Sequence, residues 1–287
     1  MKRVLKIDDW FHPDGFPISI ERREPQEPFG PHSHEFAELV VVTGGKGLHL
    51  TAAGSWELTA GDVFVIAGPE EHEYQDLRGL RLVNILYQPS QLEMRLLDLP
   101  TTPGYHALFT LEATNRWRTT ARLHLSAKEL APIIELVDRL EGELKGREPG
   151  FGFMATAVLM QIIGLLSRAF GRRPSPDGRA LARVSEVLSY LERNLQHEVK
   201  LDPLASIANM SRRSFLRAFQ SATGTAPVTW VIEKRIARAC GLLRQTDKRI
   251  TEIAFEVGFN DSNYFTRQFR KITGFSPRDY RLRRRVE

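Results

Sequence analysis

The pattern of apolar and polar residues changes along the chain. Residues 16–90 contain short segments in which apolar and polar positions alternate, including FPISIER, GLHLTA, SWELT and RLVNILY. This period of two predicts β-strands. Turns are predicted between the strands at four glycine-containing pairs: Gly44-Gly45, Gly54-Ser55, Gly61-Asp62 and Gly68-Pro69. Many short strands separated by turns predict a β-barrel or sandwich. Residues 91–125 indicate mixed helix and loop.

Apolar positions recur at helical spacing from residue 126 onward. Ser126 and Glu129 have the spacing of a capping box, and one apolar stripe follows at Leu130, Ile133, Ile134, Val137, Leu140 and Leu144. A second helix, about 152–170, is apolar on nearly all sides and must be covered on two of them. We expect the barrel to cover one side and a second subunit the other, which predicts a homodimer through residues 126–170. A helix enclosed within one subunit is the alternative.

The sequence favours a cytoplasmic protein without a membrane partner. The helix at 152–170 contains Gln161 and Arg168 and barely reaches the length of a membrane span. The first ten residues, MKRVLKIDDW, are too poor in apolar residues for a signal peptide. Cys240 is the only cysteine, so the chain cannot form an internal disulfide, which fits a reducing compartment.

The last third of the chain contains an internal repeat with an offset of 50 residues. Phe215, Arg217, Phe219, Thr223, Gly224 and Pro227 recur as Phe265, Arg267, Phe269, Thr273, Gly274 and Pro277. Such a repeat indicates one small supersecondary unit used twice. Each copy predicts two short helices joined by a turn, and the second helix carries phenylalanine on one face and arginine on the other. A helix at 227–245 joins the copies. At 1.5 Å per residue it spans roughly 28 Å, close to the roughly 34 Å turn of DNA.

The outward faces of the two second helices are candidate DNA-reading surfaces. In the first copy this face holds Arg213, Leu216, Arg217 and Gln220, and in the second Ser262, Asn263, Thr266, Arg267 and Arg270. Arginine can pair with guanine and asparagine with adenine in the major groove. Arg212 lies at the entrance of its helix and is expected to contact phosphate. Surface ion pairs are the alternative role for the arginines.

The charge distribution supports a polyanion partner for this end of the chain. Residues 180–287 carry 20 Lys and Arg against 11 Asp and Glu, a net charge of +9, whereas the rest of the chain has a net charge of −4. Residues 171–179, GRRPSPDGR, have the composition of a linker. Basic charge alone gives only non-specific attraction to phosphates. The charge together with the repeat predicts that the partner is double-stranded DNA.

Polar residues on two of the predicted strands are candidates for a small-molecule site. His32, His34, Phe36 and Glu38 share one strand face by period two, and His72 and Tyr74 offer a second such pair. Asn84 and Tyr87 are further candidates. A carboxylate, imidazoles and aromatic rings suit a sugar. The set His32, His34, Glu38 and His72 also suits a divalent metal, and a polar barrel wall without a ligand is the third possibility.

Residues 200–282 resemble the DNA-binding domain of AraC/XylS-type transcription regulators, above all through ITEIAFEVGFNDSNYFTRQFRKITGFSPRDYR. The resemblance implies two helix-turn-helix units and base contacts near Arg213 and Arg217, and near Ser262, Asn263 and Arg267. Related proteins often carry a polar residue at the position of Leu216. A leucine there can contact the methyl group of a thymine instead of making a polar contact with a base. Within the family the chain is most similar to activators that respond to L-rhamnose, through PHSHEFAELVVV, HEYQ, LVNILYQPS and FNDSNYF.

The histidine pattern is similar to that of metal-binding cupin barrels, although Ala67, Pro69 and Asp76 depart from the usual second motif. The sequence thus predicts an α+β protein: a cupin-like effector-binding barrel at 1–125, dimerisation helices at 126–170, a linker at 171–179 and an all-α DNA-binding domain at 180–287. The hypothesis is a sugar-responsive activator, cytoplasmic and dimeric, that contacts RNA polymerase, with Glu252 and Asp261 as candidate contacts. No cofactor is required. A metal-dependent cupin enzyme and a DNA-binding regulator without a ligand are the alternatives.

Overall fold

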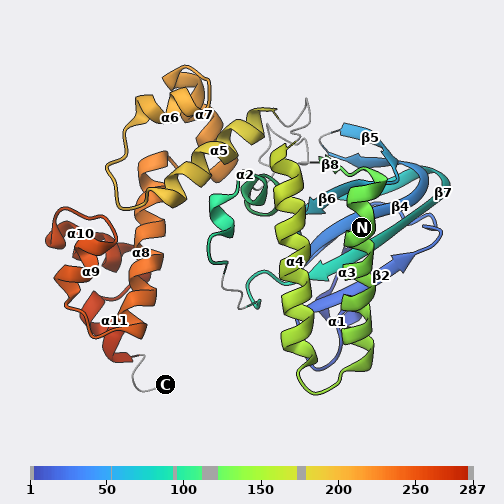
Figure 1. Ribbon diagram of the computed structural model, residues 1–287, viewed down its shortest axis with the longest axis horizontal. Coiled ribbons are helices and arrows are strands. Elements are labelled where there is room, and N and C mark those ends of the chain that lie inside the picture. The colour runs from blue at the N-terminus through green and yellow to red at the C-terminus, as the bar shows by residue number, and fades with distance from the viewer. Residues whose placement is uncertain (1–2, 53, 93–95, 112–121, 173–178, 284–287) are drawn as a thin grey trace. The chain divides into compact units, whose positions relative to one another are not determined.

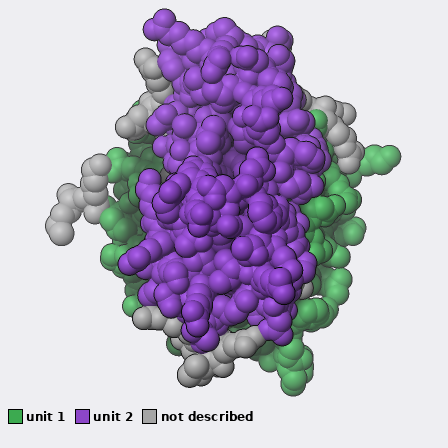
Figure 2. Space-filling view, turned by 90° about the vertical axis from the view of Figure 1, so that its left-hand side faces the viewer, with its two compact units in different colours: residues 1–185 green, residues 186–287 purple. Residues whose placement is uncertain are grey.

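The computed structural model describes the chain except residues 1–2, 53, 93–95, 112–121, 173–178 and 284–287. Its contacts divide the chain into two compact units, residues 1–185 and 186–287, which Figure 2 shows in different colours. The first unit is rich in β-structure and the second is helical, so the predicted α+β class is confirmed. Most of the predicted linker lies outside the described residues, and the exact domain boundaries stay a prediction.

The first unit is built on one eight-stranded sheet. Its strands are β1 (Arg3–Leu5), β2 (Ile18–Arg23), β3 (His32–His34), β4 (Ala37–Thr51), β5 (Gly54–Thr59), β6 (Asp62–Ile66), β7 (His72–Tyr87) and β8 (Arg122–His124). The strand order is β1-β3-β7-β4-β6-β8, while β2 pairs with β7 and β5 pairs with β4. Because β4 and β7 are long and pair along most of their length, the sheet curls around an interior (Figure 1).

One predicted turn is wrong. The segments on either side of Gly44-Gly45 form the single strand β4, which continues through this pair with shifts in register against β7. Gly45 has a φ of 69°, and a Cβ atom there would lie 1.9 Å from the carbonyl oxygen of Gly79. The glycine signal therefore marks a bend and a close backbone approach inside a strand, which glycine permits as readily as a turn.

Two helices cover the outer face of the sheet. They are α3 (Ala127–Gly146) and α4 (Phe151–Arg172), and Figure 1 shows them side by side against the strands. Ser126 and Glu129 form the predicted capping box at the start of α3. Buried residues of both helices, such as Val137 and Leu159, share one core with Leu39 and Ile85 of the sheet. By length and composition α4 could cross a membrane, a test that the core helices of soluble proteins also pass.

Short helical segments complete the first unit. They are α1 (Ile7–Trp10), the 3₁₀ turn η1 (Leu99–Thr101), α2 (Pro103–Tyr105) and the π-helical turn η2 (His106–Thr110). The strand β8 was not predicted, and neither was the pairing of β1 with β3 that brings the N-terminal segment to the sheet.

The second unit consists of helices arranged around a long central one. They are α5 (Arg179–Arg193), which begins in the first unit, α6 (Leu201–Ile207), α7 (Arg212–Thr223), α8 (Pro227–Gln245), α9 (Ile250–Glu256), α10 (Ser262–Thr273) and α11 (Pro277–Arg283). In Figure 1, α6 and α7 lie at one end of α8, and α9, α10 and α11 lie at the other. The helix α8 has the predicted limits of 227 and 245.

The two copies of the repeat agree in atomic detail. The hydroxyl of Thr223 donates to the carbonyl oxygen of Phe219 and that of Thr273 to the carbonyl oxygen of Phe269, both at 2.8 Å. The next residue in each copy is a left-handed glycine that ends the helix, with φ of 75° at Gly224 and 79° at Gly274. The residues that are identical in the two copies thus have the same structural role in each, which confirms the duplication.

The aromatic residues of the two copies are also equivalent. Phe215, Phe219, Phe265 and Phe269 are fully buried. Phe219 meets Trp230 edge to face, with ring centroids 6.4 Å apart, and Phe269 meets Tyr280 in the same way at 5.4 Å. The residues Ile236, Ala239 and Leu243 of α8 join the core of the second copy.

Side chains satisfy backbone N–H groups at the starts of three helices in the second unit. Ser211 caps α7 by accepting from the backbone N–H of Ser214, and Asp261 caps α10 by accepting from that of Asn263. The helix α9 begins at Ile250, directly after Arg249. There Glu252 accepts from the backbone N–H of Arg249 and satisfies the helix start from inside the first turn.

The bend of β4 can be tested by a pair of glycine substitutions. Gly45→Ala should lower the free energy of unfolding by about 2 kcal/mol or more, because the left-handed backbone and the contact with Gly79 both oppose a Cβ atom. Gly142→Ala is the control, since it lies in α3 with no atom near the added carbon, and it should be neutral or stabilising. Equal effects in urea unfolding would contradict the described bend.

Candidate functional site

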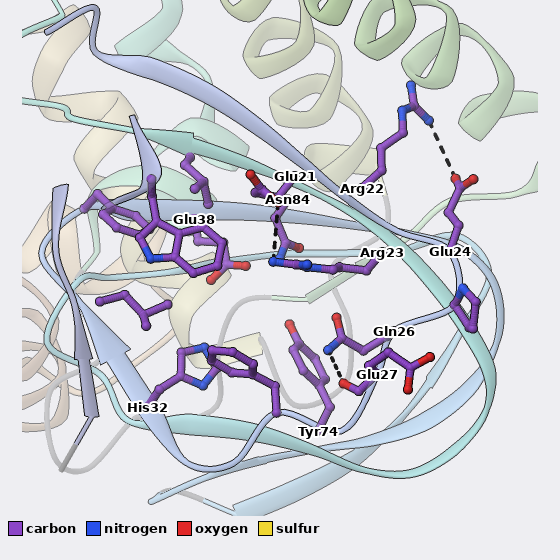
Figure 3. A pocket seen from close by; sticks show the side chains of 16 residues that line it. Glu21, Arg22, Arg23, Glu24, Gln26, Glu27, His32, Glu38, Tyr74 and Asn84 are labelled. Carbon is purple, nitrogen blue, oxygen red and sulfur yellow. Dashed lines mark hydrogen bonds and ion pairs between the residues drawn. The ribbon is translucent and has the colours of Figure 1, made fainter. Parts of the chain in front are cut away.

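The first unit contains a pocket whose lining comes from α1, from the strands β1, β2, β3, β4 and β7, and from residues 24–29 after β2 (Figure 3). Its cavity measures about 170 Å³. One water needs roughly 10–15 Å³ on the same measure, so the cavity has room for roughly ten non-hydrogen atoms. A monosaccharide is a molecule of that size. Aromatic and charged side chains both line the cavity, as expected for a site that binds a polar ligand through apolar platforms and a few directed polar groups.

Five of the eight predicted effector residues line this pocket: His32, Phe36, Glu38, Tyr74 and Asn84. Two others, His34 and His72, lie directly behind Glu38 rather than in the lining.

Tyr87 is wrong as a pocket residue. It lies three residues beyond Asn84 on β7 and therefore faces the opposite side of the sheet, where it belongs to the core under the helices.

Most of the other lining residues were not identified from the sequence, and three of them matter for the chemistry of the pocket. Glu21 and Arg23 lie on β2, and Trp10 lies at the end of α1. Figure 3 shows Arg23 extending into the pocket, where its guanidinium lies 3.3 Å from the carboxylate of Glu21. The guanidinium also lies 5.5 Å from the ring of Trp10. Glu21 and Arg23 share one face of β2 because they lie two residues apart, but only the tertiary fold shows that this face lines the cavity.

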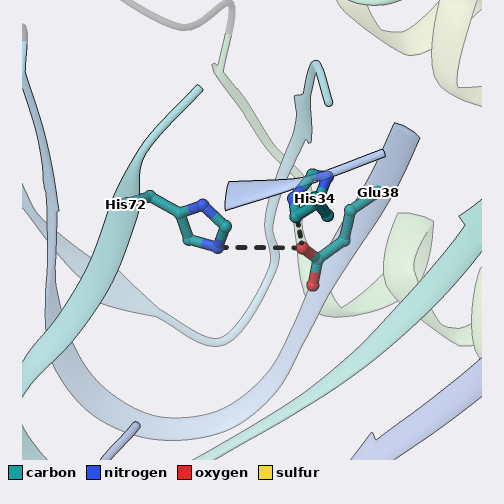
Figure 4. Close-up of side chains that lie close together, drawn as sticks. All are labelled: His34, Glu38 and His72. Carbon is teal, nitrogen blue, oxygen red and sulfur yellow. Dashed lines mark ion pairs between the residues drawn. The ribbon is translucent and has the colours of Figure 1, made fainter. Parts of the chain in front are cut away.

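The imidazoles of His34 and His72 converge with the Glu38 carboxylate behind the pocket, and we call these three residues the buried trio (Figure 4). The Nε2 atom of His34 lies 3.1 Å from Oε2 of Glu38, and that of His72 lies 3.7 Å from the same oxygen. All three side chains are buried. His32 lies outside this group, and its Nδ1 atom contacts the carbonyl oxygen of Gly30 at 3.0 Å.

Burial and hydrogen bonding shift the pKa of Glu38 in opposite directions. Burial alone would raise the pKa of Glu38, but the hydrogen bond with His34 and the neighbouring imidazoles lower the pKa below its ordinary value. Burial lowers the pKa of His72 to about 3. At neutral pH the pocket therefore contains an ionised, buried carboxylate beside a neutral imidazole.

Another buried histidine of the first unit lies outside the trio. His49 is fully buried, and neither of its ring nitrogens has a hydrogen-bond partner in the described part of the chain. Its ring lies among those of Trp56, Phe64 and Tyr74, with centroids 4.4, 4.9 and 5.0 Å away. Burial lowers the pKa of His49 to about 3.

The predicted DNA-reading faces are on the surface of the second unit. On α7, Arg212, Arg213, Arg217 and Gln220 are exposed and Leu216 is half-buried. On α10, Asn263, Thr266, Arg267 and Arg270 are exposed and Ser262 is half-buried. The phenylalanines of both helices point inward. Arginine outside and phenylalanine inside is the arrangement that the repeat predicted for a pair of reading helices.

The arginines on these faces are mostly available to a partner. Within the described residues, no ion pair is recorded for Arg213, Arg217 or Arg270. Arg212 lies 3.7 Å from Asp202, but both side chains are largely exposed, so the pair contributes little. Arg267 lies 5.8 Å from the ring of Tyr264. The alternative role in surface ion pairs therefore applies to Arg212 alone.

Comparison with known proteins identifies the class that this fold and these faces define. Residues 204–283 match the helix-turn-helix domain family, and residues 18–163 match the AraC-like ligand binding domain family. The chain belongs to the AraC family of transcription regulators. It is a DNA-binding protein with a small-molecule effector domain and not an enzyme, so the cupin-enzyme alternative is excluded.

Its relatives include proteins of nearly the same length. The HTH-type transcriptional activator RhaR of Escherichia coli (strain K12) is 30% identical over 284 residues, which covers 98% of both chains. The protein of the same name from Salmonella schwarzengrund is 30% identical over 281 residues, covering 97% of this chain and 96% of that one. Among solved structures, the DNA-binding domain of AdpA in complex with a target DNA is 36% identical, with a TM-score of 0.35, and covers 36% of this chain and 94% of that one.

The buried His49 predicts a specific dependence of stability on pH. Because its pKa is about 3 in the folded protein and about 6.5 when unfolded, the unfolded chain binds a proton below pH 6.5 that the folded chain excludes. Stability is fully present above pH 6.5 and falls by about 1.4 kcal/mol per pH unit between pH 6 and 4 for this one group. His49→Phe should remove that share of the slope in urea unfolding. An unchanged slope would contradict the buried neutral state.

Proposed function

We propose that this protein is a sugar-responsive activator of transcription. A monosaccharide binds the pocket of the first unit, and its occupancy changes the affinity of the two reading helices for DNA or the contact with RNA polymerase. The observation that carries the proposal is the pair of equivalent helices, α7 and α10, each with buried phenylalanines and exposed arginines. The relatives at 30% identity that cover nearly the whole chain are named as activators, which supports activation rather than repression.

The proposed mode of DNA reading is two helices in successive major grooves. The helix α8, with 19 residues, is roughly 28 Å long and separates the two copies by about the length of one turn of the duplex. Arg217 and Arg267 are equivalent in the repeat and exposed, so each can donate two hydrogen bonds to a guanine. Arg212 lies at the start of α7, where contact with phosphate fixes position without specifying sequence.

Substitution of single arginines tests this assignment. Arg217→Ala and Arg267→Ala should each cost about 1–3 kcal/mol in binding to the preferred site and should relax the preference at one base pair. Arg212→Ala should weaken binding to specific and random DNA alike and reduce the salt dependence. Fluorescence anisotropy on a site selected in vitro, with random DNA as the comparison, measures both effects. Equal losses on both DNAs for all three variants would show that the faces are wrongly assigned.

The pocket chemistry supports a neutral polyol as the effector. Carboxylates of Glu21 and Glu38 can accept hydrogen bonds from hydroxyl groups, and Asn84 and Arg23 can donate them. The rings of Trp10 and Phe36 offer apolar surface for the C–H faces of a sugar. Three further glutamates or glutamines border the cavity, which disfavours an anionic ligand. L-rhamnose is the first sugar to test, because the sequence resembles activators that respond to it.

A thermal-shift screen of monosaccharides on the purified protein tests the effector. One sugar should raise the melting temperature, and Asn84→Ala should weaken its binding by about 10-fold, since the loss of a hydrogen bond in a buried site costs about 1–3 kcal/mol. Tyr87→Phe is the matched control on the opposite face of the same strand and should keep full affinity. If no sugar changes the melting temperature or the DNA affinity, the effector assignment fails, and a DNA-binding regulator without a ligand becomes the better description.

Three further properties belong to the same proposal. The exposed side of α4 carries Phe153, which is 77% exposed, and Leu165, and burying this side against a second copy supports a homodimer. Glu252 and Asp261 are the proposed contacts with RNA polymerase, and both carboxylates also accept a backbone N–H at the start of a helix. A regulator that acts on DNA and polymerase is proposed to work in the cytoplasm, which agrees with its single cysteine.

A further inference from the structure

We infer that the buried trio of His34, Glu38 and His72 is a binding site for one first-row divalent metal ion, with zinc as the leading candidate, at the edge of the effector pocket. The inference deepens the proposed function, because Glu38 also lines that pocket. Binding of the metal itself does not depend on which effector the pocket accepts.

The distances within the trio match a shared metal. Zinc binds imidazole nitrogen and carboxylate oxygen at roughly 2.0–2.1 Å, and a tetrahedral arrangement then places two ligand atoms roughly 3.3 Å apart. The two imidazole nitrogens lie 3.1 and 3.7 Å from the same oxygen of Glu38. All three ligand atoms lie within 4.8 Å of one another. The two nitrogen–oxygen distances therefore lie on either side of the separation expected for two ligands of one zinc ion.

The orientation of His34 supports the same conclusion. Its Nδ1–H donates to the carbonyl oxygen of Phe36 at 2.6 Å, and the Nε2 atom of the same ring is directed at Glu38, whose Oε2 lies 3.1 Å away. A backbone carbonyl that holds one ring nitrogen while the other binds the ion is the usual outer support of a histidine ligand.

His72 repeats this pattern on the other side of Glu38. Its Nε2 atom is buried and has no hydrogen-bond partner among the described residues, while Nδ1 lies toward the carbonyl oxygen of Glu70 at 3.5 Å. Two buried imidazole nitrogens are thus directed at one carboxylate, and the nitrogen of His72 has no hydrogen-bond partner among the described residues. A buried polar group without a partner costs free energy, and one bound ion would satisfy all three groups.

The ligand chemistry selects the type of ion. Two imidazoles and one carboxylate suit zinc and its first-row neighbours, whereas magnesium and calcium prefer oxygen ligands. Three protein ligands leave a coordination position open. Because Glu38 borders the cavity, a hydroxyl group of the effector is available to fill that position. The metal would then serve as part of the recognition surface for the sugar.

Metal binding by the full chain is the direct test. The protein is dialysed against a chelator and then against zinc chloride or cobalt chloride, and its metal content and melting temperature are measured. We expect about one equivalent of metal and a rise in melting temperature of roughly 5 °C or more. Bound cobalt should also give a visible absorption band typical of nitrogen and oxygen ligands. A chain that binds no metal, with an unchanged melting temperature, would overturn the inference.

Matched histidine variants locate the site. His72→Gln should weaken cobalt binding by at least about 100-fold. His49→Gln replaces an equally buried histidine of the same barrel that is outside the trio and should bind cobalt as the unchanged protein does. If His72→Gln does not fold, Glu38→Gln takes its place, and the metal content of the unchanged protein decides in any case. Full binding in His72→Gln and Glu38→Gln would show that the ion lies elsewhere.

The sugar screen, run on metal-loaded and metal-free protein, separates this inference from the proposed function. Metal binding without a response to any sugar supports the metal site and rejects the sugar effector. A sugar response in a protein that binds no metal supports the effector and rejects the metal site. A sugar response that is at least about 10-fold weaker after removal of the metal supports both.

Discussion

The first unit depends on a simple constraint: alternate residues of a strand face opposite sides of the sheet, and in β4 and β7 both sides are buried. Leu39 and Ile85 face the helices α3 and α4, whereas Glu38 and Asn84, their immediate neighbours, face the cavity. A shift of β4 by one residue would place the Glu38 carboxylate under the helices and Leu39 in the pocket, and a shift of β7 would place the Asn84 amide under the helices and Ile85 in the pocket. Packing of the outer face therefore fixes which polar residues face the cavity. The interactions that stabilise the unit also position its binding groups.

An equivalent constraint organises the second unit. Phenylalanines four residues apart on α7 and α10 are fully buried, and their burial fixes the rotation of each helix about its axis. The arginines between them must then face outward, because they lie on the other side of the helix. The hydroxyl of Thr223 and the left-handed Gly224 end the first of these helices, and Thr273 and Gly274 end the second. The reading faces are thus set by core packing and by helix termination, both of which the repeat encodes locally.

This difference between local and non-local determinants explains what the sequence could predict. The helices of the second unit, the Ser126 capping box and the inward phenylalanines depend on spacings of three and four residues, and these predictions are confirmed. The role of Gly45 depends on its contact with Gly79, which is distant in the sequence, so a bend inside a strand was taken for a turn. Tyr87 was wrongly assigned to the pocket together with Asn84. The two residues are three positions apart on one strand, so their side chains face opposite sides of the sheet. That Arg23 lines the pocket could not be predicted, because the sequence does not show that β2 pairs with β7.

The strand β2 shows how the pocket and the helices of the first unit are physically connected. Glu21 and Arg23 point into the cavity, while Arg22 between them points outward and forms ion pairs with Asp138 and Glu141 of α3. Because β7 is the one strand that pairs with β2 among the described residues, β2 is held by fewer backbone partners than the central strands. A ligand that engages Glu21 or Arg23 acts on the same short segment that holds α3. The two sides of one edge strand therefore join the groups that contact the effector to the helix pair proposed for dimerisation, without any need for a rearrangement of the central sheet.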